Sequence, residues 1–268
     1  MDSTVGTTGK GILNAKAGEQ KYSLSRHQPS EELSGFVQHY WVVRWDLRGQ
    51  EPYRQTVLTH PNVNLVFEKD STRIYGISRA TTTRLVEGFG GVVGIKFKPA
   101  GFYPFWKTSM SELTDRSISL KEAFGVESGQ LEDEILSHDE IEPAIERAES
   151  FLIERLPEPD SNAELINEIV RTIRDDRKIV KVEDAASRAG MHIRTMQRLF
   201  DRYVGVSPKW VIKRYRLHEA AEALEKGEAQ DWVQLSLELG YYDQSHFIRD
   251  FKAVVARSPE EYIRGLHA

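Results

Sequence analysis

The amino-acid sequence predicts an α+β protein. A β-rich, barrel-like N-terminal domain with flanking helices is followed by an all-α domain of two helix-turn-helix units joined by a long helix. Three patterns support this prediction. Short apolar, β-branched runs alternate with turn residues up to Trp106, helical spacing of apolar residues begins near Leu120, and the C-terminal hundred residues contain an internal repeat.

These patterns divide the chain into five segments. We expect a flexible leader at residues 1–20, a β-rich domain at 21–119, a helical connector at 120–156, a linker at 157–163 and the all-α domain at 164–268. The leader lacks the continuous apolar segment of a secretory signal. The sequence also has no apolar run near the roughly 20 residues that span a membrane, so we expect a cytoplasmic protein without membrane contact.

Composition excludes several kinds of chemistry. The 268 residues include no cysteine, which excludes disulfides, thiolate metal sites and cysteine nucleophiles. Isolated histidines such as His27, His39 and His60 show no metal-binding spacing, so we expect no metal and no cofactor.

Charge is distributed unevenly along the chain. The net charge is −5, yet residues 188–216 hold eight basic residues against one acid, Asp201. Residues 131–164 have the opposite bias, with twelve acids against two arginines. The basic segment suits phosphate groups, whereas the acidic segment would repel them.

The N-terminal domain is predicted to contain strands at 63–67, 73–77 and 92–97. The aromatic segment 35–45 fits either a strand or a helix-strand junction. In the connector, apolar residues recur at helical spacing. Aromatic side chains of this region either line a ligand pocket or fill the barrel, and the candidate ligand-binding residues among them are Tyr40, Trp41, Phe97 and Trp106.

The internal repeat has an offset of 51 residues and implies two equivalent helical units. Phe200, Ser207 and Pro208 correspond to Phe251, Ser258 and Pro259, and Gly190 corresponds to Gly240 after a one-residue insertion. Each unit is predicted as a short helix, a glycine turn, a second helix and a Ser-Pro start to a third.

The outward faces of the second helices carry long hydrogen-bond donors, which suit the major groove of DNA. In the first unit, a helix over residues 193–204 presents Arg194, Thr195, Gln197, Arg198 and Arg202. In the second unit, the outward residues are Gln244, Ser245, His246, Arg249 and Lys252. A linking helix over residues 208–226 carries Lys209, Lys213, Arg214 and Arg216, which we expect to contact phosphates.

Residues 182–262 resemble the DNA-binding domain of the AraC/XylS family of transcription regulators. The resemblance is carried by SRAGMHIRTMQRLFDRYVGVSPKWV, LELGYYDQSHFIRDFKAVVARSPEEYI and the linking RYRLHEAAEAL. It implies sequence-specific promoter binding by the two outward faces and makes residues 164–268 the DNA-binding domain. Two positions depart from the family pattern: His192 stands where a serine or similar helix cap is usual, and Ala256 stands where Gly205 predicts a glycine.

The N-terminal runs LTHPNVNLVF at residues 58–67, GIKFKPAG at 94–101 and SELTDR at 111–116 resemble the β-rich sensor-like domain often found before this module. In related regulators such a domain is a small barrel that senses a ligand or dimerises.

The prediction is therefore a sequence-specific, double-stranded-DNA-binding transcription regulator, not an enzyme, that responds to a small-molecule effector through its N-terminal domain. The expected further partners are a second copy of the chain and, for an activator, RNA polymerase. Two alternatives stay open. The N-terminal domain is a protein-interaction or dimerisation module without a metabolite ligand, or it is a cupin-type metal enzyme; a cysteine-dependent repair enzyme is excluded by composition.

Overall fold

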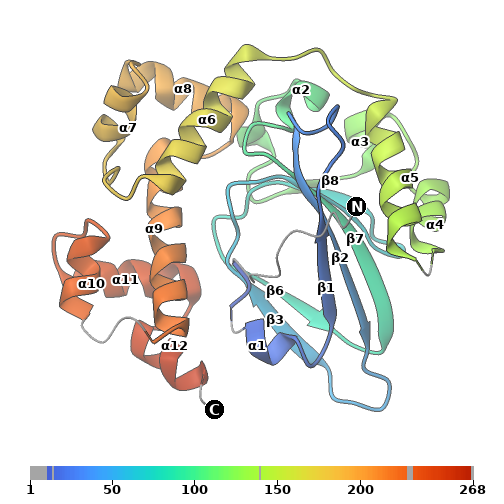
Figure 1. Cartoon of the computed structure of the whole chain (residues 1–268), viewed down its shortest axis with the longest axis horizontal. Helices are drawn as coiled ribbons and strands as arrows, with labels where there is room; N and C mark the ends of the chain where they lie inside the picture. The colour runs from blue at the N-terminus through green and yellow to red at the C-terminus, as the bar shows by residue number, and fades with distance from the viewer. Residues whose placement is uncertain (1–10, 14, 139, 228–231, 267–268) are drawn as a thin grey trace.

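The computed structural model describes residues 11–13, 15–138, 140–227 and 232–266. Antiparallel strands and short helices form the N-terminal part, and helices alone form the C-terminal part (Figure 1). The α+β prediction is confirmed. No helix in the described ranges is long and apolar enough to cross a membrane.

A curved antiparallel sheet with strand order β1-β2-β7-β4-β5-β8 forms the N-terminal part, and β3 and β6 pair as a separate ribbon. The predicted strands correspond to β4, β5 and β7, and the aromatic segment at 35–45 is mostly strand β2. The strands are β1 (Ser23–His27), β2 (Val37–Asp46), β3 (Tyr53–Val57), β4 (Asn64–Phe67), β5 (Arg73–Tyr75), β6 (Thr82–Val86), β7 (Phe89–Phe97) and β8 (Ser117–Ile118).

The two faces of the large sheet differ in chemistry. One face carries apolar side chains such as Leu65 and Ile95, which pair across β4 and β7 and are fully buried. Helices α4 (Gly129–Leu136) and α5 (Ile141–Ile153) cover it. The predicted connector stripe packs here, since Ile145, Ala148 and Leu152 are buried. The short helices of the N-terminal part are α1 (Ala15–Gly18), α2 (Tyr103–Trp106), the 3-10 helix η1 (Met110–Glu112) and α3 (Leu120–Phe124).

The opposite face carries both polar and apolar side chains, and we call it the polar sheet face after its polar residues. The strand register places Arg26, His39, Trp41, Asn64 and Lys96 on it.

The C-terminal part consists of two helical units on either side of α9 (Pro208–Glu225), as the repeat predicts (Figure 1). Gly190 and Gly240 take positive φ angles of 60° and 79° in the two turns, which glycine adopts at little cost. Ser207 caps α9 by accepting a hydrogen bond from the backbone N–H of Trp210. The other helices are α6 (Ser161–Asp175), α7 (Val182–Arg188), α8 (Ile193–Tyr203), α10 (Trp232–Glu238), α11 (Gln244–Val255) and α12 (Pro259–Leu266).

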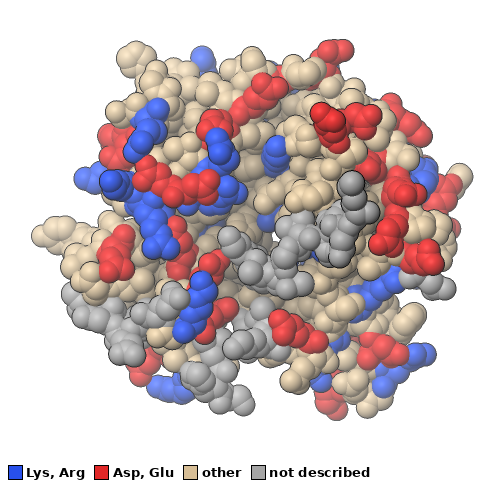
Figure 2. All heavy atoms as spheres, in the orientation of Figure 1, with Lys and Arg blue, Asp and Glu red and all other residues tan. Residues whose placement is uncertain are grey.

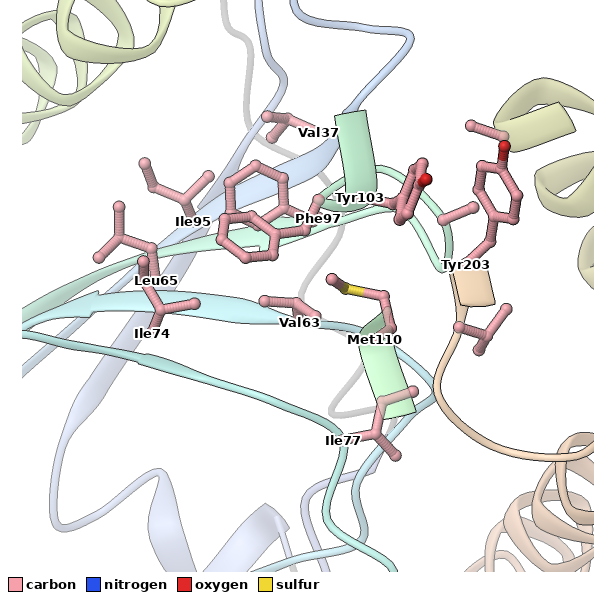
Figure 3. Close-up of a cluster of buried hydrophobic side chains, with 14 of the residues drawn as sticks. Val37, Val63, Leu65, Ile74, Ile77, Ile95, Phe97, Tyr103, Met110 and Tyr203 are labelled. Carbon is pink, nitrogen blue, oxygen red and sulfur yellow. The ribbon is translucent and has the colours of Figure 1, made fainter. Parts of the chain in front are cut away.

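One hydrophobic core runs from the sheet into the first helical unit. Figure 3 shows Phe97 and Met110 of the N-terminal part in the same cluster as Tyr203 of α8. A second, smaller core holds Phe247 and Phe251 against α9. Although the sequence predicts a linker between the parts, they pack as one body in this structure.

The predicted flexible leader differs from the structure where the structure describes it. Residues 1–10 lie outside the described residues. Ile12 forms a bridge with Val57 of β3, and Leu13 is buried beside Leu58 in the second core. Burial of these apolar side chains removes them from water and stabilises the folded protein, so this segment packs on the protein instead of staying free.

Candidate nucleic-acid interface

The first recognition helix, α8, separates a buried face from an exposed polar face. Met196, Phe200 and Tyr203 are buried, and this is the i, i+4, i+7 pattern of a helix packed on one side. Its exposed face carries Arg194, Gln197 and Arg198, with Thr195 half-buried beside them; none of the first three has a hydrogen bond or ion pair within the described part of the chain.

An open groove runs beside this face, between α7 and α8. Its lining residues from α8 and the preceding turn include His192, Arg194, Thr195 and Arg198, and α7 contributes Glu183. Figure 2 shows Lys and Arg side chains gathered on the side of the molecule where α7 and α8 lie, with Asp and Glu among them. Free guanidinium groups on an exposed helix can donate two hydrogen bonds to guanine, and a free Gln can pair with adenine.

His192 begins α8 without a side-chain cap. Its backbone is extended, with φ −68° and ψ 137°, but no side chain accepts a hydrogen bond from the first turn. The free N–H groups of this turn remain able to donate to an anion such as a phosphate.

The second recognition helix, α11, repeats this arrangement. Asp243 caps it by accepting from the backbone N–H of His246 at 2.8 Å, and the same carboxylate holds Nδ1 of the His246 ring at 2.7 Å. Ser245, Arg249 and Lys252 are exposed, and Gln244 is half-buried. Within the described residues, Arg249 has no hydrogen bond or ion pair, so its guanidinium is available to a ligand.

Two of the predicted DNA contacts are engaged with other parts of the protein in this structure. Arg214 is only 1% exposed, donates from Nη2 to the carbonyl of Arg79 at 2.6 Å and lies over the Trp210 ring. Arg202 is exposed, but its Nε donates to the hydroxyl of Tyr103 on α2 at 2.6 Å. Both side chains are directed to the protein, because the N-terminal part packs against this side of α8 and α9.

The other basic residues of α9 differ from one another. Arg216, which the sequence also predicts to touch phosphate, is 2% exposed and donates to the carbonyl of Ile173. Lys213 is half-buried and forms an ion pair with Asp250 of α11 at 2.7 Å. Lys209 is exposed, without a hydrogen bond or ion pair to any described residue. Of the four, Lys209 is the one best placed to reach a phosphate.

Three of the four candidate ligand-binding aromatics belong to the packed core. Tyr40 and Phe97 are fully buried, and the Tyr40 hydroxyl donates to Glu149 of α5 at 3.2 Å. Trp106 stacks on Phe102, with ring centroids 6.3 Å apart. These three side chains lie in the hydrophobic core or pack against it, which is what the filled-barrel alternative expects. Trp41 lies on the polar sheet face instead.

The structure brings together basic residues that the sequence did not single out. Arg26, His39 and Lys96 lie near one another on the polar sheet face, since His39 pairs with Lys96 and Arg26 pairs with Trp41. Alternation along a single strand shows which of its own residues share a face. Placing residues of different strands on the same face also requires knowing how the strands pair. Within the described residues, no three His, Asp or Glu side chains gather as metal ligands would.

Two family models match the chain. Residues 185–265 match one described as a helix-turn-helix domain, and residues 25–119 match one described as a domain of unknown function. An uncharacterized HTH-type transcriptional regulator of Haemophilus influenzae is 32% identical over 81 residues, which cover 30% of this chain and 27% of that protein. The match therefore spans about a quarter of the relative's length.

The solved structures that are similar to this chain have lower sequence identity. A transcriptional regulator with an AraC-type DNA-binding domain from Chromobacterium violaceum is 23% identical, with a TM-score of 0.35, and the match covers 38% of this chain and 91% of that one. ToxT from Vibrio cholerae is 11% identical with a TM-score of 0.39, covering 92% of this chain and 98% of that one. The C-terminal region of this chain therefore matches a helix-turn-helix domain, and it follows a region that matches a domain of unknown function.

Proposed function

We propose that this protein is a transcription regulator that binds double-stranded DNA through α8 and α11 and responds to a small molecule through its N-terminal domain. The main support for this proposal is that the two helical units present the same kind of exposed, arginine-bearing helix. Each unit holds an exposed helix whose arginines, Arg194 and Arg198 in α8 and Arg249 in α11, have no protein partner among the described residues.

The helix between the units has a suitable length. The 18 residues of α9 extend about 27 Å at about 1.5 Å per residue. Successive major-groove openings on one face of DNA lie roughly 34 Å apart. A single chain therefore has the reach to place α8 and α11 in neighbouring grooves without a second copy.

The two recognition helices are expected to contribute unequally. The first unit lies in the basic segment, and Lys209 at the start of α9 adds a free cation beside it. Phosphate contacts dominate affinity, whereas contacts to base edges set specificity. We therefore expect α8 to supply most of the affinity and α11 to add selectivity.

Packing between the two parts provides a route for regulation. The hydroxyl of Thr114 donates to the carbonyl of Gly205 at 2.7 Å, just after α8. Asn167 of α6 accepts from the backbone N–H of Ala100 at 2.9 Å. A ligand that changes the N-terminal part would change these contacts and, through them, the position of the first recognition helix.

Selection of bound DNA by the full chain from a random double-stranded pool tests the DNA-binding proposal. At about 150 mM salt we expect enrichment of sites with two half-sites about 10 base pairs apart. Loss of Arg194 or Arg249 to alanine should weaken binding by about 1–3 kcal/mol and relax preference at one position each. Arg54→Ala, at an exposed position on β3, serves as the matched control.

Lys209→Ala should weaken binding to all sequences alike, because a phosphate contact carries no sequence information. A pool that shows no enrichment at this salt concentration would refute sequence-specific binding. Equal losses for Arg54→Ala and Arg194→Ala would refute the assignment of α8 as the reading helix.

A further inference from the structure

The polar sheet face concentrates positive charge in the interior of the molecule. Lys96 on β7 pairs with His39 on β2 and with Asn64 on β4, so the three side chains project from the same face. Arg26 on β1 lies on this face as well, paired with Trp41. Helix α6 adds Arg174, whose charge acts on Lys96.

This face borders accessible space, whereas the opposite face does not. Tyr40 and Ile95, the neighbours of His39 and Lys96 along their strands, are fully buried on the helix-covered face. Arg26, His39, Trp41 and Lys96 all keep part of their surface accessible. The polar side chains of this face are therefore partly accessible to solvent, unlike the fully buried side chains of the packed core.

The charges on this face repel one another. Burial, together with the nearby cations Arg26 and Arg174, lowers the pKa of Lys96 to about 7. Burial also lowers the pKa of His39 to about 3, with Lys96 and Arg26 adding to the effect. Lys96 forms no ion pair or hydrogen bond with any described residue. An anion placed here would relieve this repulsion.

An aromatic surface lies beside the cations. The indole of Trp41 lies across Gly94, where a Cβ would come within 1.9 Å of its ring. Glycine at this position therefore allows Trp41 to lie flat on the sheet. On the same face, the guanidinium carbon of Arg84, from the β3–β6 ribbon, lies 4.8 Å from the ring centroid of Tyr75 on β5. Apolar and cationic groups thus lie on one surface.

We propose that the polar sheet face binds a small amphipathic organic anion, with its acidic group at Lys96 and Arg26 and its apolar body against Trp41. The inference rests on the proposed effector response and names the chemical class of the effector. A bound anion would interact electrostatically with both parts of the chain, because Arg174 belongs to α6 and the charge of Lys96 also acts on His218 of α9.

The test uses two fluorescent probes that differ mainly in charge, 8-anilinonaphthalene-1-sulfonate and the neutral N-phenyl-1-naphthylamine. Each is titrated into the full chain without DNA. We expect saturable binding of the sulfonate at one site. Lys96→Met should weaken it about tenfold or more, the cost of a lost hydrogen bond between charged groups, and should leave the neutral probe unaffected.

Lys69→Met, at an exposed turn position, is the matched control and should bind the sulfonate like the wild type. Arg174→Gln, on the surface of α6, should weaken sulfonate binding to a smaller extent and provides a second variant that leaves the sheet intact. Sulfonate binding that is absent, or that Lys96→Met and Lys69→Met affect equally, would overturn the proposal. Because no DNA is present, that result would leave the DNA-binding proposal standing.

Discussion

Arg202, at the end of the first recognition helix, donates its Nε–H to the hydroxyl oxygen of Tyr103 in the N-terminal part across 2.6 Å. The two aromatic rings of Tyr103 and Tyr203 also lie together, with centroids 4.2 Å apart. Nearby, the Ser111 hydroxyl donates to the carboxylate of Asp201 at 3.3 Å. The end of α8 is therefore held against the N-terminal part, while its beginning is free to meet DNA.

Tyr103→Phe tests this attachment. The variant keeps the ring contact with Tyr203 and removes only the hydroxyl that accepts from Arg202. A hydrogen bond to a neutral acceptor contributes about 1 kcal/mol, so local opening of α8 should become about fivefold more frequent. Amide hydrogen exchange of residues 193–203, measured by mass spectrometry, reports this opening.

Tyr53→Phe is the control, at a half-buried position on β3 remote from α8. Exchange in α8 that matches the wild type in both variants would show that the Tyr103 hydroxyl does not hold the recognition helix.

Arg214→Ala should destabilise the fold rather than weaken DNA contact. The Arg214 side chain satisfies the carbonyl of Arg79, and although burial lowers its pKa to about 10, it remains charged at neutral pH. Truncation leaves a cavity and an unpaired carbonyl, at a cost of about 2–4 kcal/mol in the free energy of unfolding. Urea denaturation followed by tryptophan fluorescence measures the change.

Arg214→Met keeps most of the side-chain volume and should lose less than half as much stability. Lys209→Ala, an exposed residue of the same helix, should change stability by less than about 0.5 kcal/mol. If Arg214→Ala were as stable as Lys209→Ala and yet bound DNA more weakly, the buried role of Arg214 would be wrong.

The sequence predicted the positions of helices and strands better than it predicted the tertiary contacts that bury individual side chains. The repeat located α8 and α11, because apolar residues at helical spacing and glycine turns are local signals. The burial of Arg214 and Arg216 was not predictable in this way. Arg214 donates to Arg79 of the N-terminal part, and Arg216 donates to Ile173 at the end of α6, so both depend on tertiary packing against α9. Their positive charge pointed to phosphate, but tertiary contacts decided their environment.

In the sheet, too, the sequence did not show which side chains are accessible, because this depends on which face of each strand is covered. Tyr40 and Trp41 are adjacent in the sequence and are both candidate ligand contacts by residue type, yet they project to opposite faces. Side chains alternate along a strand, so only one of the two could lie on an accessible face, and the sequence did not say which face is open. Lys96 and His39 became visible as a pair only through the pairing of β2 with β7.

Low pH should destabilise the contact between the two parts through His218. Its ring is 5% exposed, stacks on His60 at 3.9 Å, and lies 3.3 Å from the carbonyl oxygen of Thr59. Burial lowers the pKa of His218 to about 3, and the cations Arg214 and Lys96 act in the same direction. The folded protein therefore holds this ring neutral where the unfolded chain protonates it.

The stabilising effect of the neutral ring is complete above the unfolded pKa, about 6.5, and decreases as the pH falls toward 3. For one titrating group, the free energy of unfolding decreases by at most about 1.4 kcal/mol per pH unit. The difference in unfolding free energy between wild type and His218→Gln should therefore shrink or reverse from pH 7 to pH 5. A difference that stays constant over this range would show that His218 does not titrate with unfolding.

Gly205 and Ala256 occupy equivalent positions of the repeat, and both have left-handed backbones, with φ of 93° and 63°. A Cβ at Gly205 would lie 2.5 Å from the carbonyl oxygen of Met110, in the N-terminal part. Gly205→Ala should therefore destabilise the protein by at least about 2 kcal/mol, because backbone strain and a steric clash add.

Ala256→Gly should have the opposite sign and stabilise the protein by about 0.5–1 kcal/mol, since glycine relieves the strain but costs more entropy on folding. Urea midpoints of the two variants measure both effects. Ala253→Gly, an exposed position within α11, is the matched control and should destabilise the helix by about 1 kcal/mol. Equal destabilisation by Ala256→Gly and Ala253→Gly would show that the left-handed end of α11 is not strained, and that the second unit tolerates alanine where the first requires glycine.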